Sequence, residues 1–347
     1  MNPIKTALTS FGMSGWVFHA PFLQADKNFE FYAVWERSKK LAAKRYPSVK
    51  SFDTYEEMLA DPAIELVVVN TPNYTHYEFA KKALLAGKNI IVEKPFTVNS
   101  AEGEELIRIA AEKNLMLSVY HNRRFDSDYK TVKKVVESGA LGKIVEAEIH
   151  YDRFKDELSP KVHKETPGPG TGALYDLGSH LVDQALQLFG QPDAVFADID
   201  SLRPISKVDD YFELLMYYPG SRVRLKASYQ VREALPGYAI HGSKGSFIKP
   251  KTDVQETMLQ AELTPDADNW GIEPESERGL LHTEKGGQIL REYIPSERGQ
   301  YGDYYKGIAG AIRKKSQPPV SAQDGLNVVK IIEAAFRSSK EKKVIHL

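Results

Sequence analysis

The sequence predicts a mixed α/β protein of two domains, in which a doubly wound parallel sheet precedes an α+β domain with a large, mostly antiparallel sheet. Three observations lead to this prediction. The chain has 347 residues, more than one hydrophobic core usually supports. Short apolar runs alternate with helical patterns in its first third, and a strict polar/apolar alternation replaces them afterwards. We expect one domain over residues 1–122 and a second over residues 123–347.

The apolar runs of the first third are typical of parallel strands. Leu66-Val67-Val68-Val69 and Ile90-Ile91-Val92 show little alternation, as a sheet covered on both faces requires. Tyr77, Ala80 and Leu84 recur at helical spacing in one of the segments between such runs. The expected strands span 4–8, 29–34, 65–70, 89–92 and 116–120, and the expected helices 54–60, 75–86 and 100–113.

The second domain begins with a change of period. Residues 145–151 and 223–229 alternate between apolar and polar side chains, which indicates a sheet with one face on a core and the other wet or used for association. The C-terminal helix is expected at about 322–340, with Ser321 as its N-cap. Residues 262–300 are polar and irregular, and the sequence assigns them no element.

Composition limits the function classes. Lys and Arg number 46 against 47 Asp and Glu, so the chain lacks the basic excess of a nucleic-acid binder. With no cysteine, a disulfide framework, a cysteine nucleophile and a thiolate zinc site are excluded, and a reducing cytoplasm is the expected location. The first residues show no export signal, and no apolar run approaches the ~20 residues of a membrane span. We expect no nucleic-acid or membrane partner.

A glycine-containing turn follows the first expected strand. It reads Ser10-Phe11-Gly12-Met13-Ser14-Gly15, an S-x-G-x-x-G variant of the dinucleotide fingerprint of Rossmann domains. The two glycines let the backbone approach a pyrophosphate at a helix N-terminus. The first glycine of the pattern is missing, and Ser10 makes the turn only if its φ stays negative. An ordinary glycine turn is the alternative.

Acidic Glu36 ends the second strand, about 20 residues further on, where a carboxylate can bind the ribose hydroxyls of the cofactor. The adjacent Arg37 can instead receive the 2'-phosphate of NADP. A surface ion pair between the two is a third possibility. The pair leaves NAD and NADP open, with NADP slightly favoured.

Two further segments follow expected strands at the edge where parallel sheets bind ligands. Thr71-Pro72-Asn73 and His76 come after one strand, and Glu93-Lys94-Pro95 after the next. An ammonium group at Lys94 can favour the alkoxide of a substrate hydroxyl during oxidation and polarise the carbonyl during reduction. A structural ion pair between Lys94 and Glu93 is the alternative.

In the second domain, a Pro/Gly-rich stretch at 167–172 precedes a helix expected to begin near Ala173. Asp176 and His180 stand four residues apart on that helix, so a carboxylate and an imidazole share one face. His180 suits general acid/base work, and Asp176 can orient it or bind a substrate hydroxyl. A metal site with Asp183 as third ligand lacks a fourth candidate, so we expect no metal.

These motifs together resemble the glucose-fructose oxidoreductase/inositol dehydrogenase (Gfo/Idh/MocA) family. The resemblance rests on the degenerate fingerprint, Glu93-Lys94-Pro95, His121-Asn122-Arg123-Arg124-Phe125 and Tyr175-Asp176-Leu177-Gly178-Ser179-His180. It covers nearly the whole chain. Within the family, the sequence is most similar to the branch of NADP-dependent scyllo-inositol dehydrogenases.

The resemblance implies a Rossmann domain followed by a sheet domain, with the active site in the cleft between them. It implies that Lys94 is the catalytic lysine, that Pro95 often follows a cis bond, and that Asp176 and His180 bind the substrate and carry acid/base chemistry. Asn122 is assigned to the cofactor on the same ground. Family members commonly associate through the open sheet face, so a homodimer or higher homo-oligomer is expected.

We therefore expect an NAD(P)-dependent dehydrogenase or reductase that moves hydride between nicotinamide and a CH–OH group of a small polyhydroxylated substrate, a cyclitol or sugar. Two alternatives stay open. One is a non-catalytic dinucleotide-binding regulator that senses redox state. The other is a sugar-modifying enzyme that uses tightly bound NAD in a transient oxidation.

Overall fold

The computed structural model describes residues 2–36 and 40–347, except for the side chain of His163. Its described residues form two compact units. The first contains the chain up to Asn122 together with two later segments, 255–270 and 300–326. The second contains residues 123–254, 271–299 and 327–347.

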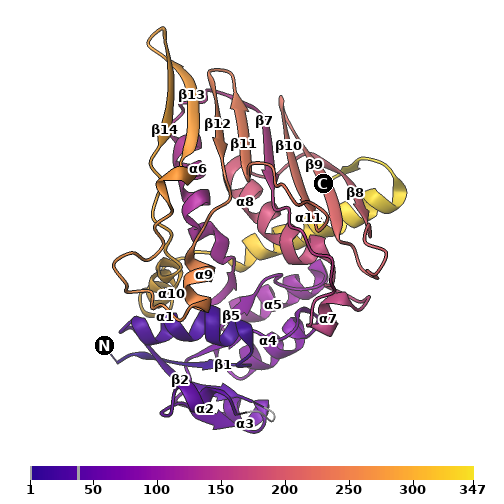
Figure 1. Ribbon diagram of the computed structural model, residues 1–347. Coiled ribbons are helices and arrows are strands. Elements are labelled where there is room, and N and C mark those ends of the chain that lie inside the picture. Colours follow the sequence, from indigo (N-terminus) through magenta and orange to yellow (C-terminus); the bar gives the residue numbers. More distant parts are fainter. Residues whose placement is uncertain (1, 37–39) are drawn as a thin grey trace. The chain divides into compact units, whose positions relative to one another are not determined.

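The first unit is built on a parallel sheet, for which the described residues give six strands in the order β3-β2-β1-β4-β5-β6 (Figure 1). This is the strand order of a doubly wound dinucleotide-binding fold, in which the strands after β3 are added on the other side of β1, beginning with β4. The carboxyl ends of β1 and β4 therefore form the ligand-binding edge. The strands are β1 (Ile4–Leu8), β2 (Phe29–Trp35), β3 (Lys50–Phe52), β4 (Leu66–Val69), β5 (Asn89–Glu93) and β6 (Leu117–Tyr120).

Local signals determine where the helices of this unit begin. Thr54 and Glu57 form a capping box at the start of α3, and the side chain of Asn99 accepts a hydrogen bond from the N–H of Glu102 at the start of α5. The helical segments are η1 (Ser14–His19), α1 (Ala20–Ala25), α2 (Ala42–Arg45), α3 (Tyr55–Ala60), η2 (Asn73–Thr75), α4 (His76–Leu85) and α5 (Ser100–Glu112).

The later segments contribute α9 (Gln255–Gln260) and α10 (Gly302–Lys314) to the same unit. Tyr304 of α10 is fully buried and its hydroxyl lies 2.7 Å from the Oγ of Ser118 on β6. The buried indole of Trp270 donates to the side-chain oxygen of Gln255 at 3.2 Å. The periodicity of the sequence contained no indication of this return.

The second unit contains a sheet whose described strands follow the order β14-β13-β12-β11-β7-β10-β9-β8-β15 (Figure 1). β7 and β10 pair in parallel and the other neighbours are antiparallel. The strands are β7 (Ile144–His150), β8 (Ala194–Asp200), β9 (Tyr211–Tyr218), β10 (Ser221–Ser228), β11 (Tyr238–Gly242), β12 (Gly245–Lys249), β13 (Gly279–Lys285), β14 (Gln288–Ile294) and β15 (Ile345–His346).

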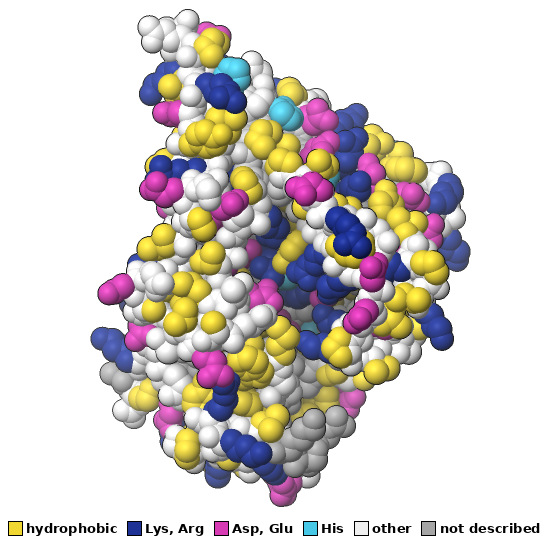
Figure 2. Space-filling model, viewed as in Figure 1, with side chains coloured by type: hydrophobic (Ala, Val, Ile, Leu, Met, Phe, Trp, Pro, Cys, Tyr) yellow, Lys and Arg dark blue, Asp and Glu magenta, His cyan; other side chains and the backbone are white. Residues whose placement is uncertain are grey.

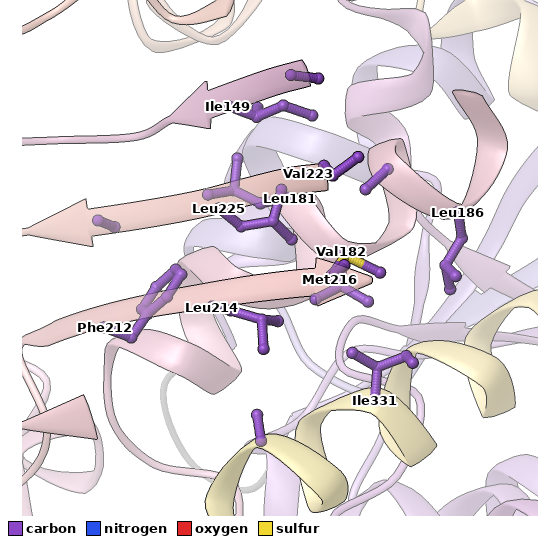
Figure 3. Packing of buried hydrophobic residues seen from close by; sticks show 14 of the residues in the cluster. Ile149, Leu181, Val182, Leu186, Phe212, Leu214, Met216, Val223, Leu225 and Ile331 are labelled. Atoms are coloured by element: carbon purple, nitrogen blue, oxygen red, sulfur yellow. The ribbon is translucent and has the colours of Figure 1, made fainter. Parts of the chain in front are cut away.

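Helices cover one face of this sheet and create the core. Leu181, Val182 and Leu186 of α8 pack with Leu214 and other inward side chains of the strands (Figure 3). Burial of such aliphatic side chains contributes roughly 1.5–3 kcal/mol each to folding. The helical segments are η3 (Asn122–Phe125), α6 (Ser127–Glu137), α7 (Val162–Glu165), η4 (Leu174–Gly178), α8 (Ser179–Phe189), η5 (Glu275–Glu277) and α11 (Ala322–Glu341).

The C-terminal helix begins as the sequence predicted. The N–H of Asp324 donates to Ser321 Oγ at 3.1 Å, and the N–H of Ser321 donates to Asp324 Oδ2 at 2.9 Å. These reciprocal bonds satisfy two donors that the start of a helix leaves unpaired.

Residues 262–300, which the sequence left unassigned, include the hairpin of β13 and β14. Buried Leu281 and Thr283 of β13 alternate with half-buried or exposed neighbours, but nearly all of β14 is exposed. An outer strand with so few buried positions shows little apolar pattern. The fold class itself is confirmed, and no helix of the described chain is long and apolar enough to cross a membrane.

Candidate functional site

The turn after β1 is held against the end of β4 by one amide side chain. Asn70 Oδ1 accepts a hydrogen bond from the N–H of Ser10 at 3.0 Å, and Asn70 Nδ2 donates to Ser10 O at 3.0 Å. The hydroxyl of Ser10 donates to Asn70 O at 2.9 Å, and Thr9 Oγ1 bonds to the same amide. Ser10 is not among the described residues with positive φ, so it replaces the usual glycine without left-handed backbone.

The two glycines of the turn have different surroundings. A Cβ on Gly15 would lie 2.5 Å from Ser10 O and 3.2 Å from Asn70 Nδ2, so only glycine lets η1 begin this close to the turn. A Cβ on Gly12 would meet nothing within 4 Å, which leaves the backbone there open to a ligand. An open backbone in front of a tightly packed helix start fits a dinucleotide pyrophosphate. Ser10, Gly12, Met13, Ser14 and Gly15 thus form one continuous turn.

Glu36 ends up with its carboxylate turned into the protein. It is 7% exposed, and its oxygens accept hydrogen bonds from the N–H groups of Leu41 and Ala42 at 2.7 Å and 3.1 Å. These bonds satisfy unpaired donors at the start of α2. Both oxygens therefore have protein partners. Arg37, the other candidate for the ribose end of the cofactor, lies outside the described residues.

His76 connects two loops at the carboxyl ends of β4 and β5. Its Nε2 lies 2.9 Å from Thr71 O and its Nδ1 lies 2.8 Å from Pro95 O. Burial lowers the pKa of His76, although the hydrogen bonds to these carbonyls oppose that shift. Thr75 Oγ1 binds Pro72 O at 2.6 Å and completes the turn that contains Asn73. His76 itself is fully buried, and it positions the segment 71–73 that precedes it.

Glu93 is the centre of a polar cluster at the end of β5. Ser14 Oγ donates to Glu93 Oε1 at 2.5 Å, and His19 Nε2 lies 3.0 Å from the same oxygen. The other ring nitrogen of His19 lies 2.6 Å from the hydroxyl of buried Tyr305 on α10. Burial raises the pKa of Glu93, but the bonds from His19 and Ser14 and the charge of Lys94 outweigh it and lower the pKa to about 2.

Lys94 follows this anchored carboxylate directly. The N–H of Lys94 donates to Glu93 Oε2 at 3.2 Å, and the Lys94–Pro95 peptide bond is cis. The backbone of Lys94 is therefore fixed on one side by a buried carboxylate and on the other by Pro95, whose carbonyl binds His76. Asn122, the remaining cofactor candidate, is 6% exposed at the start of η3, shortly after β6.

The second unit presents Asp176 and His180 at the start of α8. The helix opens with the π-helical turn η4, from Leu174 to Gly178, and not with the regular α-helix that the sequence predicted near Ala173. Asp176 Oδ2 binds Lys164 Nζ at 2.9 Å, and His180 is 5% exposed. Single π-helical turns occur frequently at functional sites.

Asp209 holds this opening turn in place. Its carboxylate accepts a hydrogen bond from the N–H of Leu174 at 2.8 Å, and its carbonyl accepts one from Ala173 at 2.8 Å. A Cβ on Gly172, whose φ is +94°, would lie 1.8 Å from the Asp209 carboxylate. The glycine-rich stretch before the helix is therefore a close approach of backbone to a buried acid. Burial raises the pKa of Asp209 to about 6 although these hydrogen bonds lower it.

Asp183, one turn further along α8, pairs with arginine. Arg124 Nε and Nη2 lie 2.8 Å and 2.5 Å from its two oxygens, so the interaction is bidentate. Among the described residues, no group of three or more His, Cys, Asp or Glu side chains is arranged to hold a metal ion.

Sequence reasoning missed several residues that shape these sites. Asn70 and His19 each lie next to a motif, but their partners, Ser10 and Tyr305, are 60 and 286 positions away. Lys164 and Asp209 carry no motif at all. A polar residue directly after a buried strand, as at Asn70, was the one local signal available.

Comparison with known proteins agrees with this geometry across the chain. Residues 4–121 match the model described as oxidoreductase family, NAD-binding Rossmann fold, and residues 133–347 match the corresponding C-terminal alpha/beta domain. The chain belongs to the Gfo/Idh/MocA oxidoreductase family. It is an NAD(P)-dependent oxidoreductase, as the sequence predicted.

Individual relatives cover the full length. The NADP-dependent scyllo-inositol 2-dehydrogenase IolW of Bacillus subtilis is 41% identical over 100% of this chain and 97% of its own length. The solved structure of the oxidoreductase YvaA from Bacillus subtilis covers 100% of this chain and 99% of its own with a TM-score of 0.96 at 41% identity. An oxidoreductase structure from Bacteroides fragilis is 47% identical, with a TM-score of 0.91 and coverage of 99% and 100%.

The lowered pKa of Glu93 predicts a pH-dependent stability. An acid whose pKa falls from 4.5 to about 2 on folding stabilises the protein fully above pH 4.5 and loses that contribution as the pH falls through 2. Glu93→Gln should therefore cost roughly 3 kcal/mol at pH 7 and progressively less towards pH 3. Urea unfolding across this range measures the difference. Exposed Glu112→Gln is the control, and a cost independent of pH would contradict the assignment.

Proposed function

We propose that the chain transfers hydride between nicotinamide C4 and a secondary alcohol or ketone of a cyclitol or sugar. The observation that carries the proposal is the full-length similarity to an NADP-dependent scyllo-inositol dehydrogenase. The polar side chains of Lys94, Asp176 and His180 support it, because each can bond to the hydroxyl groups of such a substrate.

The nicotinamide cofactor, when bound, gives or takes the hydride. The open turn at Gly12 is where we place its pyrophosphate. Lys94 donates a hydrogen bond to the reacting oxygen of the substrate, which favours the alkoxide during oxidation and polarises the carbonyl during reduction. The anchoring of Glu93 by Ser14 and His19 fixes the backbone from which the Lys94 side chain extends.

In the same proposal, His180 moves the hydroxyl proton and Asp176 orients the substrate. An imidazole titrates near neutral pH and can both accept and donate a proton. Lys164, 2.9 Å from Asp176, orients this carboxylate and offsets its charge. Asp176 then accepts a hydrogen bond from a substrate hydroxyl beside the reacting carbon.

Replacement of Lys94 tests this assignment. Lys94→Ala should lower turnover by ~100-fold or more, because it removes an electrostatic group at the reacting oxygen, while NADPH binding survives. Turnover is followed by NADPH absorbance across a panel of inositols, sugars and their keto derivatives. Exposed Lys113→Ala is the matched control. Unchanged turnover in Lys94→Ala rejects the role, and no turnover by wild-type protein with any polyol rejects the proposed function.

The cofactor preference follows from Glu36. Since its carboxylate already accepts bonds from Leu41 and Ala42, it is poorly placed to bind the ribose hydroxyls that select NAD. The sequence Arg37-Ser38-Lys39-Lys40 beside it offers cations and a hydroxyl for a 2'-phosphate. We therefore propose that NADP is preferred.

Arg37→Ala should weaken NADP binding by about tenfold or more and leave NAD binding unchanged, because only NADP carries the 2'-phosphate. Dissociation constants from fluorescence titration of both cofactors give the comparison, and exposed Lys44→Ala serves as control. Equal losses for NADP and NAD would place Arg37 elsewhere.

We also propose that copies of the chain associate through the outer face of the large sheet. On β9, half-buried Tyr211, Glu213 and Leu215 alternate with core residues, and Arg224 of β10 pairs with Glu148 and Glu213 across three strands. A face that combines apolar side chains with paired charges suits a partly polar interface.

Leu215→Arg should shift the mass measured by light scattering from an oligomer to a monomer, because it introduces an unpaired charge into the interface. Leu85→Arg, at an exposed position of the first unit, should leave the mass unchanged. A wild-type monomer at micromolar concentration would refute the association.

A further inference from the structure

Positive side chains gather where β7 and β10 end (Figure 2). The segment 151–155 continues β7 alongside residues 226–231: the N–H of Arg153 donates to Ser228 O at 2.8 Å, and the N–H of Lys155 donates to Tyr229 O at 2.9 Å. Regular pairing ends there, since Phe154 bridges Gln230 in the antiparallel sense, but the charges of Arg153 and Lys155 remain close enough to interact.

Two aromatic rings support these cations. The guanidinium carbon of Arg153 lies 4.6 Å from the centre of the Tyr151 ring, and Lys155 Nζ lies 5.1 Å from the centre of the Tyr229 ring. A cation held this close to an aromatic ring is attracted by the ring's negative face, and this attraction restricts the positions that the cation takes. The two groups are therefore ordered without the help of an acid.

Neighbouring cations have acidic partners, whereas these two do not. Lys164 binds Asp176 at 2.9 Å, and buried Arg203 binds Asp210 at 2.8 Å with Glu165 at 3.5 Å. Within the described part of the chain, no carboxylate lies within ion-pair distance of Arg153 or Lys155. Positive charge is thus left over at the end of β7.

This surplus charge adjoins Asp176, the proposed substrate ligand. Lys155 interacts electrostatically with Arg153, Lys164 and Asp176, and the ring of Tyr229 interacts with both Asp176 and Arg153. Burial lowers the pKa of Lys155, and the nearby charge of Arg153 lowers it further, although Asp176 raises it. Like charges held close together, with no acid in ion-pair contact with either, favour an anion that binds to both.

We propose that Arg153 and Lys155 bind an anionic group of the substrate, so that the preferred polyol carries a carboxylate or a phosphate in addition to its hydroxyls. The inference rests on the proposed function for the hydroxyl-bearing part of the substrate. A guanidinium fork binds two oxygens of either anion, and the ammonium group adds a point charge beside it. Neutral cyclitols and sugars would lack these bonds.

The kinetic test compares matched neutral and anionic substrates. NADPH absorbance is followed with glucose, glucuronate and glucose 6-phosphate, and with inositol and inositol 1-phosphate. We expect kcat/KM for at least one anionic member to exceed that of its neutral partner by about tenfold or more. The glucuronate and phosphate arms distinguish the two anions. Equal or better use of the neutral members overturns the inference and leaves the proposed function intact.

Variants assign the preference to the two residues. Arg153→Gln, Lys155→Gln and the double variant should reduce the ratio of anionic to neutral kcat/KM by about tenfold or more, with the dissociation constant for NADP unchanged. The matched control is Arg232→Gln, because Arg232 is an exposed arginine that stacks on Phe154 and lies 3.8 Å from Asp156. A preserved ratio, or a loss of NADP binding without a change in ratio, overturns the inference.

A binding measurement keeps the inference testable without turnover. Inorganic phosphate and glucuronate are titrated calorimetrically into the NADP-saturated protein. We expect the wild type and Arg232→Gln to bind them. Replacement of the exposed Lys155 by Gln should weaken this binding. Such binding without turnover of any polyol supports the anion site and rejects the proposed function. Absence of binding, or binding that Lys155→Gln and Arg153→Gln leave unchanged, rejects the anion site.

Discussion

The hydrogen bonds between Asn70 and Ser10 are the constraint on which the cofactor edge of the first unit depends. They join the carboxyl ends of β1 and β4, the two strands between which the order of the sheet reverses. Ligands bind at this point in folds of this strand order. Because the amide both donates and accepts, it satisfies the backbone of the turn without a left-handed residue. Gly15 can then begin η1 in contact with the turn, and Gly12 stays open to the outside.

The same device recurs along the edge. His76 binds carbonyl oxygens of the loops after β4 and β5, and Glu93 accepts bonds from Ser14 and His19 of η1. Each loop is therefore held by a buried polar side chain from another element. Buried polar groups that are fully paired rigidify their surroundings, whereas unpaired ones are costly. A lysine placed after such a carboxylate has a defined backbone position, which suits the role proposed for Lys94.

Each unit places one candidate side chain, Ser14 or Asp176, on a π-helical turn. Ser14 and His19 lie on η1, and Asp176 lies on η4 at the start of α8. The insertion that makes a π-helical turn changes the direction of the residues on either side of it. At η4, Asp209 satisfies the backbone at this opening turn, while Gly172 provides the space that its carboxylate needs. The regular helical spacing between Asp176 and His180 predicted that a helix carries both residues. It did not predict that Asp176 lies in a π-helical turn at the start of that helix.

The sequence by itself determined the class of both sheets, the strands of the first unit except β3, the capped C-terminal helix and the motifs at Gly12, Lys94, Asp176 and His180. These features depend on contacts between near neighbours, which leave a periodic or short pattern. Only the tertiary structure decided the return of 255–270 and 300–326 to the first unit, the inward turn of Glu36, and the surplus charge of Arg153 and Lys155. Each of these depends on which distant residues satisfy a buried donor, acceptor or charge, and pairing of that kind follows from packing in space and leaves no periodicity along the chain.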